Sequence, residues 1–99
     1  MAMPKARLIR DRKMVLSDGA IVQIRVWEVA APVPPSEHRF KYSLFYGKDG
    51  KRLVGYDNER GKGGHKHIGD EEFPYTFVDI DTLFADFLAD VERLRGEPV

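Results

Sequence analysis

The sequence predicts an α+β domain in which an antiparallel sheet of four to five strands, built from two hairpins, is covered on one face by a C-terminal amphipathic helix. Three observations predict this fold. The first half of the chain alternates apolar and polar residues, Asp-Gly turn signals separate the alternating runs, and an apolar stripe of helical period lies near the C-terminus. With 99 residues the chain has room for one domain, spanning 1–99.

The first expected hairpin joins the alternating runs 7–16 and 21–29. Between them lies Asp18-Gly19, a turn signal because glycine adopts positive φ without a Cβ clash. In the second run Val22, Ile24 and Val26 point to one side, so one face of this hairpin is expected to form core.

Prolines at 32, 34 and 35 end the first hairpin, because proline lacks the N–H that a β-ladder needs. The runs 39–46 and 51–56 then form a second hairpin around Asp49-Gly50. A short apolar stretch, 73–78, is interrupted by Pro74. It is either a fifth, edge strand or an extended lead into the helix.

The C-terminal helix is expected to begin at Asp81, a good N-cap residue, and to end at Gly96. Its apolar positions recur at steps of three and four residues and form one stripe, which we expect to pack on the sheet. The stripe consists of Leu83, Phe84, Phe87, Leu88, Val91 and Leu94.

Composition excludes several classes of protein. The absence of cysteine excludes disulfides and thiol chemistry and fits a cytoplasmic location. No apolar run approaches the roughly 18 residues of a membrane-spanning helix. The net charge of zero hides an asymmetry: residues 1–70 carry 14 basic against 8 acidic side chains, and residues 71–99 carry 2 against 8. The basic part suits a polyanionic partner.

The segment 56–67 has no large apolar residue after Tyr56, so a core does not explain its composition. Five of the nine glycines fall within residues 55–69, interleaved with Arg60, Lys62 and Lys66. Glycine-rich backbone and basic side chains together suit a phosphate, although the spacing matches neither a Walker nor a Rossmann motif.

His65 and His67 lie two residues apart in this segment. A histidine pair beside basic residues can act as general base and acid in RNA cleavage, where the substrate supplies the attacking 2′-hydroxyl. Two other interpretations remain open. The segment can be a flexible exposed loop without function, or the histidines can bind a metal together with Asp57 or Glu59.

The chain resembles the TumE-like toxins of prokaryotic toxin-antitoxin operons. The resemblance rests on residues 27–29 and 33–44, and above all on the pattern Tyr-Asp-Asn-Glu-Arg-Gly-Lys-Gly-x-His-x-His that begins at Tyr56. It continues through 72–75 and the helix start at 79–81. The resemblance implies a small toxin that degrades RNA and is paired with a helix-turn-helix antitoxin encoded beside it.

Together these observations favour a metal-independent endoribonuclease without a cofactor. The expected catalytic residues are Tyr56, Asp57, Arg60, His65 and His67, with Asp57 orienting a histidine or bracing Arg60. The expected nucleic-acid-binding residues are Lys51, Arg52, Lys62 and Lys66. The alternative is a non-catalytic module that binds nucleic acid or protein through the same basic segment. Aromatic residues in the run 39–46 that one helix cannot cover lead us to expect a homodimer.

Overall fold

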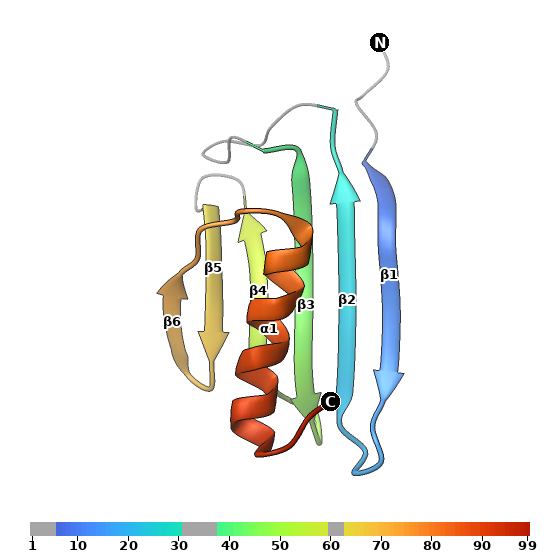
Figure 1. Cartoon of the computed structure of the whole chain (residues 1–99), viewed down its shortest axis with the longest axis vertical. Coiled ribbons are helices and arrows are strands. Elements are labelled where there is room, and N and C mark those ends of the chain that lie inside the picture. Colours follow the sequence, from blue (N-terminus) through green and yellow to red (C-terminus); the bar gives the residue numbers. More distant parts are fainter. Residues whose placement is uncertain (1–5, 31–37, 60–62) are drawn as a thin grey trace.

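A computed structural model describes residues 6–30, 38–59 and 63–99 of the chain. Within them, six strands form one antiparallel sheet in which each strand pairs with the next along the chain, and one helix lies across a single face of that sheet (Figure 1). The elements are β1 (Arg7–Val15), β2 (Ile21–Glu28), β3 (Phe40–Lys48), β4 (Lys51–Glu59), β5 (Gly63–Ile68), β6 (Glu71–Pro74) and α1 (Ile80–Arg95). In this part of the chain, no helix is long and apolar enough to cross a membrane.

The α+β class, the antiparallel sheet, the two hairpins and the C-terminal helix are confirmed. Both expected turns contain glycine in the left-handed region, with φ of 84° at Gly19 and 76° at Gly50. Asp49 also has positive φ, 55°, a conformation that aspartate tolerates better than most residues. The turn signals therefore set the register of both hairpins.

The number of strands was wrong: the sheet has six strands rather than four or five. β4 runs three residues beyond the expected end, and the segment that we interpreted as a loop returns as β5. β6 is the edge strand and ends at Pro74, where a missing N–H costs no ladder bond. Backbone pairing with β4 makes β5 a strand despite its glycines and histidines, which have no strong preference for β structure.

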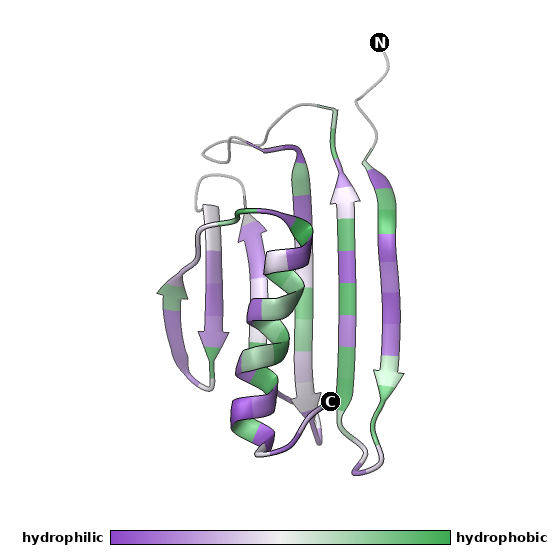
Figure 2. Cartoon of the chain, in the orientation of Figure 1, coloured by the Kyte–Doolittle hydropathy of each residue, from purple (hydrophilic) through white to green (hydrophobic). Residues whose placement is uncertain are grey.

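Alternation along the strands divides the sheet into a face covered by α1 and an open face, and Figure 2 shows the alternating hydropathy along β2. The covered face holds the core, in which Val26, Val54, Leu83 and Phe87 are fully buried. Tyr42 is 1% exposed, and burial raises the pKa of its phenol to about 12. The remaining buried apolar residues of this core are Ala20, Val22, Ile24, Leu44, Tyr46, Tyr56 and Val91.

The helix begins two residues earlier than expected. Asp79, not Asp81, is the N-cap, and its carboxylate accepts a hydrogen bond of 2.6 Å from the backbone N–H of Thr82. The stop at Gly96 is confirmed: the residue has φ of 76° and its N–H donates to the carbonyl of Glu92. Asp79 lies well before Leu83, the first residue of the apolar stripe, so the apolar spacing alone did not identify Asp79 as the N-cap.

A buried carboxylate joins the helix to the sheet. Asp90, which is not part of the apolar stripe, is 3% exposed and accepts hydrogen bonds from Tyr56 of β4 and from Lys66 of β5, the latter at 3.2 Å. Arg93 donates to its other oxygen at 2.7 Å. Burial alone raises the pKa of the Asp90 carboxyl, but the hydrogen bonds outweigh burial and hold that pKa below its usual value. The carboxylate is therefore ionised and fully partnered.

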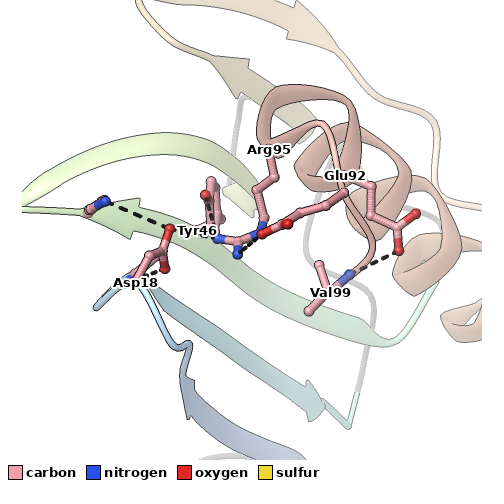
Figure 3. Close-up of polar contacts among 8 residues, drawn as sticks. Asp18, Tyr46, Glu92, Arg95 and Val99 are labelled. Atoms are coloured by element: carbon pink, nitrogen blue, oxygen red, sulfur yellow. Dashed lines mark hydrogen bonds and ion pairs between the residues drawn. The ribbon is translucent and has the colours of Figure 1, made fainter.

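A second tie holds the C-terminal end of the helix. The Arg95 guanidinium lies 3.1 Å from both Asp18, in the β1–β2 turn, and the Tyr46 hydroxyl of β3 (Figure 3). Its side chain is only 6% exposed. These contacts fasten the last turn of α1 to the end of the sheet that carries the β1–β2 turn.

We predict that Asp90→Asn lowers the free energy of unfolding by about 1.5–3 kcal/mol, because hydrogen bonds to a charged acceptor contribute about that much. Urea unfolding followed by circular dichroism measures the change. Glu92→Gln, the same kind of substitution at an exposed position of the same helix, is the control and should shift stability by less than about 0.5 kcal/mol. Equal effects of the two substitutions would contradict a special role for Asp90.

Candidate functional site

The register of the sheet brings the two histidines of β5 together with a carboxylate of β4 on the open face. Asp57 pairs with His65, and Gly55 pairs with His67. Since side chains two residues apart point to the same face of a strand, both imidazoles lie opposite the side that α1 covers. The ligand atoms of Asp57, His65 and His67 all lie within 4.8 Å of one another. We call these three residues the Asp57–His65–His67 cluster.

His65 is the buried member of the cluster. Its side chain is 5% exposed, its Nε2 contacts the Asp57 Oδ1, and its Nδ1 lies 3.3 Å from the carbonyl oxygen of Gly63. Glu72, on β6, approaches the same Nε2 at 3.9 Å. With an acceptor beside each ring nitrogen, the orientation of the His65 imidazole is set by its neighbours, while Asp57 remains 32% exposed.

An arginine reaches the cluster because of a bulge and a glycine. The register shifts between Tyr46 and Gly47, so that Arg52 rather than Leu53 pairs with Gly47. The Arg52 side chain crosses the sheet above Gly55, its Cδ 2.8 Å from the place that a Cβ there would occupy. The guanidinium is thereby carried toward His67, the cross-strand partner of Gly55.

The electrostatics of His67 reflect these neighbours. Burial lowers the pKa of the His67 imidazole, and the positive charge of Arg52 lowers it further, against an opposing effect of Glu72. The ring is therefore largely neutral at pH 7, which is the form that accepts a proton. Its plane is nearly perpendicular to that of His65, at 84°, with ring centroids 5.0 Å apart.

Two chemistries fit this donor set. One carboxylate and two imidazoles can exchange protons with a substrate, and the same three groups are also ligands that a divalent transition metal accepts. The Arg52 charge that lowers the pKa of His67 also opposes a cation at this place. Asp57 and Glu72 bring negative charge to the same place, so this donor set is compatible with either chemistry.

Three other expected site residues that the structure describes lie away from the cluster. Tyr56 and Lys66 lie on the covered face, where both contact Asp90. Tyr56 is 1% exposed, and burial together with the Asp90 hydrogen bond raises the pKa of its phenol. Lys51 is exposed at the start of β4 and pairs with Lys48. Arg60 and Lys62 lie outside the described residues.

Sequence reasoning missed Glu72, which reaches His65 from β6, and two open-face residues in the same cross-strand row as Asp57. That row contains Arg25 of β2 and Ser43 of β3. The spacing of two between the histidines already placed them on one face of any strand. Only the pairing of β4 with β5 and β6 identifies what lies beside them.

The fold and the site define a small antiparallel α+β protein with two histidines and a carboxylate gathered on the open face of its sheet. A comparison with known families finds that the model described as Toxin TumE matches residues 5–95, nearly the whole chain. The protein therefore belongs to the TumE toxin family, which confirms the resemblance found in the sequence. No curated protein and no solved structure matches.

We predict that the pKa of His67 in the folded protein lies below the ordinary value of 6.5, and that Arg52→Ala raises it because a nearby positive charge is removed. Titration of the imidazole signals by NMR measures both. Lys51→Ala removes the neighbouring exposed lysine and is the matched control, with no expected effect. An unchanged His67 pKa in Arg52→Ala would show that the guanidinium does not lie beside the ring.

Proposed function

We propose that this toxin is a metal-independent endoribonuclease that cleaves RNA at the Asp57–His65–His67 cluster. The observation that supports the proposal is the placement of two imidazoles and a carboxylate within 4.8 Å on an uncovered sheet face, beside the cationic Arg52. RNA carries its own nucleophile, the 2′-hydroxyl. The protein therefore has only to move protons and to neutralise the charge that develops on the phosphate.

In the proposed reaction, neutral His67 takes the proton of the 2′-hydroxyl, whose oxygen attacks the adjacent phosphorus. The bond from phosphorus to the 5′-oxygen breaks, and the leaving oxygen takes a proton from the His65–Asp57 pair. The products are a 2′,3′-cyclic phosphate and a 5′-hydroxyl end. Arg52 offers two parallel N–H donors to the non-bridging oxygens, which gain charge in the transition state.

We expect purified protein to cleave RNA in excess chelator, and His67→Ala to slow cleavage by about 10²–10⁴-fold, the usual contribution of general acid–base catalysis. Asp57→Asn and His65→Ala should each impair the same step, and comparing them shows which member of the pair delivers the proton. Asp70→Asn, an exposed carboxylate in the β5–β6 turn, is the control. Unfolding midpoints verify that each variant is folded.

Other results of that experiment point elsewhere. Cleavage that disappears in chelator and returns with one divalent ion would replace proton transfer by metal chemistry at the same three residues. RNA binding without cleavage would favour the alternative of a non-catalytic module. Cleavage untouched by substitution of either histidine would remove the cluster from the mechanism.

The pH dependence of cleavage follows from the lowered pKa of His67. A base must be neutral to accept a proton, so the rate rises as pH increases through the His67 pKa, and the lowered pKa places this rise below pH 6.5. Arg52→Ala should move the rise to higher pH as well as slow the reaction. Single-turnover rates between about pH 5 and 9 provide the profile. A rise above pH 6.5 in the wild type would contradict His67 as the base.

Membership in a toxin family implies a cognate antitoxin, and we propose that it is a helix-turn-helix protein that silences the toxin in the cytoplasm. A homodimer stays a prediction with less support than the sequence suggested. Of the aromatic residues of β3 on which it rested, Tyr42 and Tyr46 are buried under α1. Phe45 alone of that set points to the open face, and sedimentation at tens of micromolar protein tests association.

A further inference from the structure

Two large aromatic side chains on the open face have no role in the core. Trp27 of β2 and Phe45 of β3 are half-buried, yet neither belongs to the core cluster or to the residues that pack against it. Packing in the core therefore does not explain the presence of either residue. A half-buried aromatic ring on the uncovered face of a sheet is a surface on which an unpaired base can stack.

The register connects these rings to the cluster. Phe45 pairs with Gly55, and Gly55 pairs with His67, so Phe45 lies two strands from the proposed base. Strands in a sheet are about 4.8 Å apart, which makes this separation about 10 Å. Trp27 pairs with Lys41. This pair lies two residues along the strands from the row of Asp57, on the side away from Phe45. The rings thus lie on the β2–β3 side of the cluster, within a few nucleotides of it.

The ring of Phe45 reaches along its own strand to Gly47. Its Cε1 atom is 2.8 Å from the place that a Cβ of Gly47 would occupy, so the missing side chain of Gly47 provides the space for the ring. A larger residue at position 47 would displace the ring from this place.

Charge on this part of the open face suits a polyanion. Lys13 pairs with Gln23 and shares the row of Phe45, and Lys41 pairs with Trp27. Arg25 lies between them, in an exposed pair with Asp11 at 3.4 Å. With Arg52, these side chains give four positive charges, against the negative charges of Asp11, Asp57 and Glu72 on the same face. Phosphates along a nucleic-acid strand complement that surface.

We propose that single-stranded RNA lies across the open face of the sheet, with bases stacked on Trp27 and Phe45 and phosphates against Lys13, Lys41 and Arg25, and so delivers one phosphate to the Asp57–His65–His67 cluster. The inference rests on the proposed function. A duplex does not fit, because its bases are already stacked on each other and are not available to the rings.

Trp27 is the only tryptophan of the chain and reports on stacking directly. The probe is a fluorescein-labelled 12-nucleotide RNA with 2′-O-methyl groups, which lacks the attacking hydroxyl and leaves every catalytic residue unchanged. Binding of the unlabelled oligomer should quench the Trp27 fluorescence. In anisotropy titrations, Trp27→Ala and Phe45→Ala should each weaken binding about 5- to 150-fold, the range that stacking of one base contributes. Trp27→Phe should retain most of the affinity.

Two adjacent residues of β1 provide a matched control for charge. Lys13 lies on the open face, whereas Arg12 pairs with Ile24 and so lies on the other face, and both are exposed. Lys13→Ala should weaken binding several-fold and make it less dependent on salt, and Arg12→Ala should do neither. A duplex of the same sequence should not compete.

The outcomes separate this inference from the proposed function. Binding that depends on Trp27 and Phe45, without cleavage of natural RNA, supports the path and overturns the endoribonuclease. Cleavage of natural RNA with unchanged affinity in both aromatic variants overturns the path alone. Loss of binding in Arg12→Ala but not in Lys13→Ala would place RNA on the other face. Trp27 quenched by the antitoxin but by no RNA would identify the face as a protein-binding surface and overturn the proposal.

Discussion

The ionised carboxylate of Asp90 is the interaction on which the arrangement of this molecule depends. It is 3% exposed and receives hydrogen bonds from Tyr56, Lys66 and Arg93, so that one acceptor joins α1 to β4 and β5. A buried ion of this kind is costly to leave unpaired, so a shift of the helix that broke these contacts would be strongly destabilising. The contact therefore selects the covered face and, by exclusion, leaves the other face open.

Alternation along β5 places the residue that contacts the helix and the two histidines of the proposed site on opposite faces of the sheet. Lys66 points to the helix and is used in holding it, while His65 and His67, its two neighbours, point to the open face. The same division occurs in β4 between Tyr56 and Asp57. Because the side-chain period of a strand is two, a shift of one residue in the β4–β5 register would bury the histidines and expose the lysine. The stability of the sheet and the composition of the site are consequently linked.

An open six-stranded sheet with one helix leaves an unusually large face for binding, and the glycines of that face determine what it presents. Gly55 allows Arg52 to cross the sheet toward His67, and Gly47 leaves room for the ring of Phe45. Neither glycine has positive φ, so close approach and not backbone conformation explains them. The sequence led us to associate the glycine-rich segment with phosphate binding. Part of its role is steric, because Gly55 leaves space that the Arg52 side chain occupies.

The sequence by itself determined the α+β class, both hairpins, the C-terminal helix with its stop at Gly96, and the family, because turn glycines and periodic apolar residues are local signals. It also indicated Asp57, His65 and His67 as candidate catalytic residues and Arg52 as a candidate nucleic-acid-binding residue, because their residue types suit proton transfer and phosphate contact. It did not indicate β5, the N-cap at Asp79, or the burial of Asp90 and Tyr56. Those features come from pairing between strands and from a contact between residues 34 positions apart, and only the tertiary structure decides such contacts.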